Sequence, residues 1–173
     1  MLTPEIVQKL NSQLNLEFFS SNLYFQMSAW CDSNGFEGAA NFLRKQKQEE
    51  MEHMERIFAY ISECNAVPLI GKIKAAPHEF SSLNHIFNEI YKHEQSVTEA
   101  INELALSAFE QADLSTFNFL QWFISEQHEE EKLFKGILDR LDMVGNDGKA
   151  LFFIDRELAE MANQSTESIM SRT

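Results

Sequence analysis

The feature that most constrains the fold is a helical spacing of apolar residues that continues through four long segments of the chain. In residues 83–105 the apolar side chains follow one another at steps of three or four: Leu83, Phe87, Ile90, Val97, Ile101 and Leu104. The step between Ile90 and Val97 is taken by Glu94. This spacing is typical of an amphipathic helix with one buried face. Only 6 glycines and 3 prolines occur in 173 residues, which favours long helices over turn-rich β structure.

Start and stop signals divide the chain into four long helices and a shorter fifth one. Thr3 and Pro4 are a helix cap and a first helical residue, and "GNDGK" at 145–149 ends the fourth helix. The helices are expected at about residues 3–32, 36–64, 82–110, 113–144 and 150–161. The polar residues from 161 to 173 form a tail that is expected to fray. We therefore predict one domain over residues 1–160, followed by this tail.

The connections between the long helices predict their arrangement. Each long helix would extend for ~43–45 Å, which indicates an all-α four-helix bundle. The first two helices are joined by a short turn, and so are the last two, so each pair is expected to be antiparallel. Residues 65–81 contain Pro68, Gly71 and Pro77 and show no period. Fully extended, this segment reaches at most ~56–61 Å, so it can cross the whole bundle and place the second and third helices parallel.

Charge and composition exclude several classes of function. A formal net charge of −13 argues against non-specific nucleic-acid binding and is compatible with attraction of cations. The first residues lack the pattern of a signal peptide, and no apolar run approaches the ~18 residues of a membrane span. Cys31 and Cys64 fall near opposite ends of one helical hairpin, so a disulfide between them is not expected. We predict a cytoplasmic protein without a membrane partner.

Each of the four long apolar faces is interrupted by a carboxylate near the middle of its helix. These residues are Glu17, Glu50, Glu94 and Glu130. Residues at helix centres meet in one layer whichever way each helix points. Buried together and ionised, four carboxylates are prohibitively costly unless cations neutralise them or most of them stay protonated. Carboxylates with an imidazole suit hard or borderline divalent metals, including iron and manganese.

The spacing on the second helix supports a two-metal centre. Glu50 and His53 form Glu-x-x-His, which places both ligands on one helix face. Symmetric di-iron bundles carry this motif on two helices. Here the fourth helix has Gln127-x-x-Glu130 instead. We predict an asymmetric site, with Glu17, Glu50 and His53 for one metal and Glu50, Glu94 and Glu130 for the other. Gln127 is expected to orient water or oxygen.

For other residues the sequence leaves two readings open. Tyr24 lies two turns from Glu17, so it either hydrogen-bonds a metal-bound group, supplies an electron, or is plain core. Trp122 is interpreted as packing. The acidic residues Glu49, Glu126 and Glu129 belong to runs that are usually solvated helix faces. Any one buried glutamate could instead reach solvent along its flexible side chain. The remaining charged residues are interpreted as surface or structural groups: Glu52, Glu55, Glu131, His78, His85, His93 and His128.

The chain resembles the bacterial non-haem ferritins over about residues 1–160. The matching stretches are "NLEFFSSNLYFQMSAW", "QEEMEHMERIF", "YKHEQ", "FNFLQWFISEQHEEEKLF" and "LFFIDREL". The resemblance implies a shell of twenty-four subunits that stores iron. It implies that dioxygen or hydrogen peroxide oxidises two Fe²⁺ at Glu17, Glu50, His53, Glu94 and Glu130, with Gln127 close by. It also implies a third iron site at Glu49, Glu126, Glu129 and Glu130, and a role for Tyr24 beside the centre.

Met51 holds the position at which bacterioferritins bind haem. Those proteins resemble the symmetric template, whereas this chain has Gln127-x-x-Glu130. We therefore interpret Met51 as a packing residue and expect no haem. Two other functions fit the same pattern: a di-iron enzyme without storage, which size measurement would separate from a shell, and a helical scaffold that binds no metal.

Overall fold

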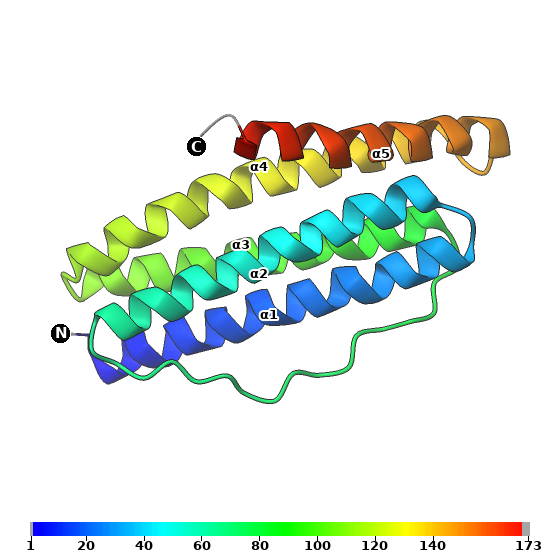
Figure 1. Ribbon diagram of the computed structural model, residues 1–173. Helices are drawn as coiled ribbons and strands as arrows, with labels where there is room; N and C mark the ends of the chain where they lie inside the picture. The colour runs from blue at the N-terminus through cyan, green and yellow to red at the C-terminus, as the bar shows by residue number, and fades with distance from the viewer. Residues whose placement is uncertain (1, 171–173) are drawn as a thin grey trace.

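The structure is a computed structural model that describes residues 2–170, with side chains described up to residue 164. Within that range it contains five helices and no strand (Figure 1). The helices are α1 (Pro4–Ser33), α2 (Glu37–Glu63), α3 (Leu83–Glu110), α4 (Leu114–Val144) and α5 (Gly148–Met170). The predicted all-α bundle and the bounds of its four long helices are confirmed to within about three residues.

Side-chain caps fix where three of the long helices begin. The Thr3 hydroxyl accepts a hydrogen bond from the Ile6 N–H, and Pro4 occupies the first turn of α1. Ser82 caps α3 and Asp113 caps α4 in the same way. These bonds satisfy N–H groups that have no partner inside the helix, which is why the chain turns helical at these points.

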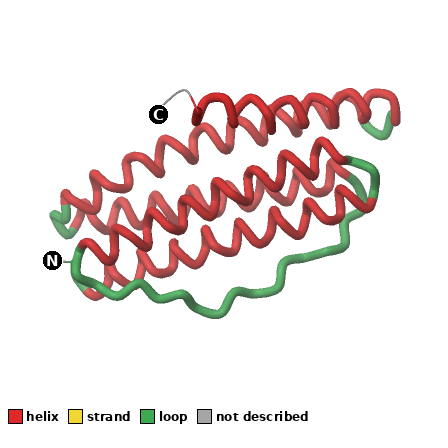
Figure 2. The backbone as a smooth tube through the Cα atoms, in the orientation of Figure 1, coloured by secondary structure: helices red, strands yellow, loops and turns green. Residues whose placement is uncertain are grey.

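The crossover between α2 and α3 runs the length of the bundle, so these two helices are parallel (Figure 2). Two asparagines of α1 hold its backbone. Asn11 Oδ1 accepts from the Leu69 N–H at 2.6 Å, and Asn15 bonds the Leu69 carbonyl at 2.8 Å and the Gly71 N–H at 2.7 Å. The predicted crossover is confirmed, and its attachment to α1 explains how a segment without regular structure keeps a defined path.

The fifth helix is longer than predicted. The expected end near Met161 is wrong, because α5 continues to Met170. Ile154, Leu158 and Ala162 are buried at steps of four, so the apolar register passes the predicted end. Packing against α2 and α4 therefore continues one residue past the predicted end, and the helix itself extends further, to Met170. The last residues of the expected tail, 171–173, lie outside the described residues.

A carboxylate of α5 caps α2, which lacks a side-chain cap of its own. Asp155 accepts hydrogen bonds from the Gly38 N–H at 3.0 Å and the Ala39 N–H at 2.8 Å. A Cβ at Gly38 would lie 1.8 Å from the Asp155 carbonyl oxygen, so only glycine allows this approach. The N-terminus of α2 is therefore capped only while α5 packs against it.

The apolar core is divided into two clusters. The first surrounds Tyr24, Leu43, Phe87 and Phe134. The second surrounds residues nearer the other end of the bundle: Leu10, Leu14, Ile57, Ile101 and Phe123. On every long helix the polar residues of the predicted layer fall between the members of the two clusters. The expectation that the four carboxylates share one level of the bundle therefore holds.

Two further expectations concern the cysteines and membranes. Cys31 and Cys64 are both free, as predicted. Burial, followed by the charge of Asp155, raises the pKa of the Cys31 thiol to about 12, so it is a neutral core side chain. Among the helices of the described region, none combines the length and apolar character needed to cross a bilayer.

Candidate metal centre

Six polar side chains lie buried in the layer between the two apolar clusters. Their exposed fractions are 1 % for Glu17, 3 % for Glu50, 5 % for His53, 1 % for Glu94, 3 % for Gln127 and 8 % for Glu130. Five of these side chains are ionisable, and burial of so many ionisable groups is rare unless they are paired or bind a metal. The alternative in which these glutamates reach solvent is thus wrong for all four of them.

Three of these residues converge on one point. Glu17, Glu50 and His53 each offer a ligand atom, and the three atoms lie within 4.8 Å of one another. Glu50 Oε2 is 3.4 Å from His53 Nδ1, since residues three apart share a helix face. Gln13, one turn before Glu17, donates its amide N–H to Glu17 Oε1 at 2.7 Å. The first predicted metal position therefore has its donors together.

The second half of the layer is organised around Glu94. The Tyr24 hydroxyl donates to Glu94 Oε1, and Gln127 Nε2 donates to Glu94 Oε2 at 2.9 Å. Tyr24 is fully buried, so it is a core residue, and its hydroxyl also donates to a carboxylate of the layer. A role in electron transfer stays a prediction. The amide of Gln127 thus holds a carboxylate of the layer, and its expected role in orienting water or oxygen stays a prediction.

The carboxyl groups of the layer have raised pKa values, as expected where no positive charge offsets buried carboxylates. Burial raises the pKa of Glu17, and the neighbouring Glu50 raises it further. Burial likewise raises the pKa of Glu50 and Glu130, with the charge of Glu94 as the next cause for both. The pKa of Glu94 is also raised by burial, although the hydrogen bonds from Tyr24 and Gln127 lower it. Each carboxylate therefore tends to hold a proton until a cation replaces it.

Two carboxylate oxygens of the layer are buried without a partner among the described residues. They are Oε2 of Glu17 and Oε2 of Glu130. A buried acceptor without a partner costs stability. Both atoms are free to bind a cation, and among the described residues the donors that gather within 4.8 Å of one another are those of Glu17, Glu50 and His53.

The second acidic set is only partly assembled. Glu49 is half-buried, contacts Gln46 and lies 3.5 Å from Lys45. Glu126 is half-buried, and both Glu49 and Glu126 raise the pKa of Glu130, which places them close to it. Glu129 is 69 % exposed and pairs with Lys132 at 3.8 Å. A third iron site at these residues stays a prediction.

Residues that were interpreted as structural have packing contacts. Met51 and Trp122 border the second apolar cluster, and the Trp122 ring lies edge-on to His53 with Arg56 over it at 4.0 Å. His93 bonds Ser20 Oγ at 2.7 Å. Burial, then the charge of Lys74, lowers the pKa of His93 to about 4, so it is neutral.

Sequence reasoning missed Gln13 as a partner of the centre. Gln13 is 3 % exposed, one turn from Glu17. A polar residue beside the apolar face one turn from a candidate ligand is the signal that could have found it.

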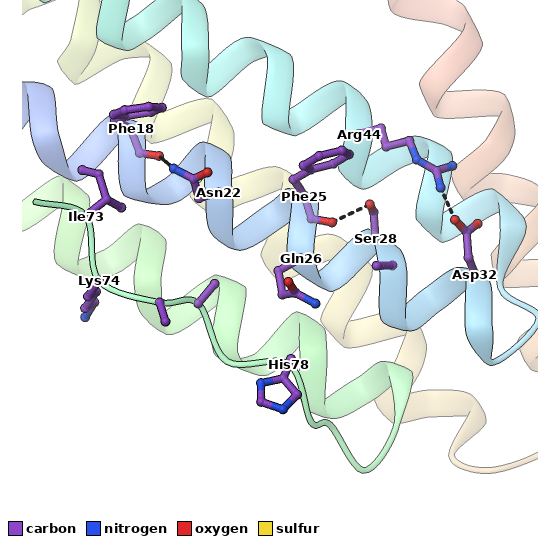
Figure 3. A pocket seen from close by; sticks show the side chains of 13 residues that line it. Phe18, Asn22, Phe25, Gln26, Ser28, Asp32, Arg44, Ile73, Lys74 and His78 are labelled. Atoms are coloured by element: carbon purple, nitrogen blue, oxygen red, sulfur yellow. Dashed lines mark hydrogen bonds and ion pairs between the residues drawn. The ribbon is translucent and has the colours of Figure 1, made fainter.

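A large pocket lies away from the buried layer. Its volume is about 990 Å³, and it opens between α1, α2 and the crossover, with Arg44 and Asp32 paired at one end (Figure 3). Phe18, Phe25 and Ile73 supply apolar walls. None of the six residues of the layer lines it, so this pocket is not the metal centre.

The four-helix bundle with a fifth helix and a buried carboxylate layer defines a class, the ferritin-like bundles, and the sequence comparison agrees on this class. The family model described as a ferritin-like domain matches residues 7–144. The chain therefore belongs to the ferritin family.

Individual relatives support a bacterial non-haem type. The chain is 54 % identical to the bacterial non-heme ferritin of Escherichia coli O157:H7 over 165 residues, covering 95 % of this chain and 100 % of that protein. It is 51 % identical to a probable bacterial non-heme ferritin-like protein of Haemophilus influenzae over 165 residues, with the same coverage. Among solved structures, an open pore ferritin from Archaeoglobus fulgidus superimposes with a TM-score of 0.91 at 37 % identity, covering 92 % of this chain and 98 % of that one.

Proposed function

We propose that this protein stores iron and that its buried layer is a ferroxidase centre. The observation that carries the proposal is the burial of Glu17, Glu50, Glu94 and Glu130 with His53 and without a compensating cation among the described residues. Fe²⁺ is the substrate, and Fe³⁺ is stored as a ferric oxyhydroxide mineral. The relatives named as bacterial non-heme ferritins, matched over their whole length, support this assignment.

The residues divide into two iron positions. Glu17, Glu50 and His53 hold the first Fe²⁺, and Glu50, Glu94 and Glu130 hold the second, so Glu50 bridges them. Binding displaces protons from carboxyl groups whose pKa values burial raises. Tyr24 and Gln127 position Glu94 through its two oxygens.

The oxidation step balances with either oxidant. Each of two Fe²⁺ ions loses one electron. Dioxygen takes up these two electrons and two protons to give hydrogen peroxide, whereas hydrogen peroxide takes up two electrons and two protons to give two molecules of water. The protein contributes geometry and negative charge, which favours Fe³⁺ over Fe²⁺. Glu49, Glu126, Glu129 and Glu130 are proposed to receive a third iron ion.

The surface supports assembly into an oligomer. Large apolar side chains are exposed on several elements: Phe25, Val67, Leu69, Ile70, Leu106, Phe109, Phe152 and Phe153. Exposed apolar groups of this size are typical of surfaces that another subunit covers. We propose a shell of twenty-four identical subunits in the cytoplasm, with no haem, nucleic-acid or membrane partner.

Aerobic iron oxidation tests the proposal. His53→Ala and Glu94→Ala should each abolish rapid oxidation of Fe²⁺, followed by absorbance, while the particle keeps its size. Glu55→Gln, an exposed carboxylate of α2, is the control and should oxidise iron normally. If both alanine variants oxidise iron at the wild-type rate, the centre is assigned wrongly. A particle far below twenty-four times the 20.0 kDa chain mass would exclude the shell.

A further inference from the structure

A small cavity between α3 and α4 ends at Gln127, the residue whose amide donates to Glu94. Its volume is about 210 Å³, and its lining includes Thr98, Asn102, Gln127, His128 and Glu131. Gln127 is the buried end, because its amide also donates to Glu94. Asn102 and His128 are exposed and form the mouth. A water molecule takes up ~30 Å³ in the liquid, so the cavity has room for a divalent cation with about six waters.

A continuous line of polar contacts connects Glu131 to Glu94. Thr98 donates its hydroxyl to Glu131 Oε1 at 2.5 Å, and Gln127 Nε2 lies 3.4 Å from the Thr98 hydroxyl and 2.9 Å from Glu94 Oε2. Glu94 and Thr98 lie one turn apart on α3, and Gln127 and Glu131 lie one turn apart on α4. The contacts therefore alternate between the two helices. The polar groups therefore continue from the buried layer to the cavity over one turn of each helix.

Glu131 is the one carboxylate in the lining of this cavity. It is half-buried, makes no salt bridge within the described region, and is close enough to Glu94 to raise the pKa of that residue. A carboxylate, an imidazole and amide oxygens are donors that Fe²⁺ accepts. A negative charge inside a low-dielectric cleft raises the local concentration of cations.

We propose that Fe²⁺ reaches the second iron position through this cavity, with Glu131 as the carboxylate that captures the ion. The cation leaves bulk water at Asn102 and His128, is held at Glu131, and passes Gln127 to Glu94. No bond other than metal–ligand contacts forms or breaks, and the oxidation state of iron does not change during the transfer. The proposal rests on the proposed ferroxidase function and assigns a role to a residue that would otherwise be surface charge.

The test compares two variants that act on the route in different ways. Glu131→Gln removes the charge but keeps an acceptor for Thr98, and Asn102→Trp fills the mouth but keeps the charge. Both should raise the Fe²⁺ concentration that gives half the maximal oxidation rate by about fivefold, with the maximal rate little changed. Glu99→Gln removes the same charge from an exposed neighbour of Thr98 that lies outside the cavity, so it is the matched control.

An anaerobic titration with Fe²⁺ separates the route from the centre. Because the ligands of both iron positions are intact, the number of ions bound should match the wild type in both variants, and Asn102→Trp should also keep the wild-type affinity. The rate of binding in stopped-flow measurement should fall in both. Wild-type kinetics in either variant would overturn the proposal, and slow oxidation only in Glu131→Gln would mean that this charge acts on Glu94 through space. If the unmodified protein does not oxidise iron, the proposed function fails and the route with it.

Discussion

The Asp155 carboxylate is expected to contribute more to stability than any other exposed or half-buried acidic residue of α4 and α5. Its two oxygens accept the Gly38 and Ala39 N–H groups of a helix that has no side-chain cap of its own. Loss of a helix cap costs about 0.5–2 kcal/mol. Loss of a negative charge at a helix N-terminus costs about 0.3–1 kcal/mol. Together these predict that Asp155→Ala lowers the free energy of unfolding by about 2 kcal/mol.

Urea unfolding at fixed protein concentration measures this effect. With a slope of about 1–3 kcal/mol per molar urea, the midpoint should fall by about 1 M. Asp155→Asn keeps one acceptor oxygen and should fall between the wild type and Asp155→Ala. Asp139→Ala on α4 is the matched control, because its ion pair with Lys135 is exposed to solvent and its loss should change the midpoint little. Equal losses in Asp155→Ala and Asp139→Ala would refute the capping argument.

Three further predictions concern the centre and its surroundings. Burial raises the pKa values of the four carboxyl groups in the folded state: Glu17, Glu50, Glu94 and Glu130. The free energy of unfolding of the metal-free protein should therefore fall as the pH rises above the ordinary carboxyl pKa of about 4.3. Urea unfolding at several pH values measures this fall, and Glu94→Gln should make it smaller. Anaerobic Fe²⁺ at a hundred times its dissociation constant should raise the free energy of unfolding by about 2.7 kcal/mol, seen as a higher melting temperature, and no rise would contradict binding to the folded state. Tyr24→Phe should slow iron oxidation about tenfold by removing a hydrogen bond to a carboxylate, whereas Tyr60→Phe, whose hydroxyl bonds Thr116 far from the layer, should not.

The sequence predicted the buried layer well because periodicity determines which face of a helix is buried. Glu94 could be assigned to the core from the apolar residues on either side of it, without knowledge of its partners. The same reasoning located Glu17, Glu50 and Glu130. These residues lie in one layer of the bundle because each is near the centre of its helix. A residue at a helix centre stays in that layer whichever way the helix runs.

What the sequence did not predict depends on contacts between distant segments. The cap of α2 is supplied by Asp155, more than a hundred residues away, and no local signal indicates such a pair. The burial of Ala162, beyond the predicted end of the fifth helix, depends on how α5 packs on the bundle. The bond from Gln127 to Glu94 and the pairing of Glu129 with Lys132 depend on side-chain rotamers, which periodicity does not determine.

The donors of the centre come from the middles of four separate helices and none comes from a connection. A displacement of one helix by a single turn, ~5.4 Å, would carry its carboxylate out of reach, so axial slippage and iron binding are mutually exclusive. The apolar clusters above and below the layer oppose that slippage from both sides. Exchanges in the segment 72–80, which supplies none of these donors and lies beyond the bonds that Asn11 and Asn15 make to the crossover, should therefore leave the chemistry intact.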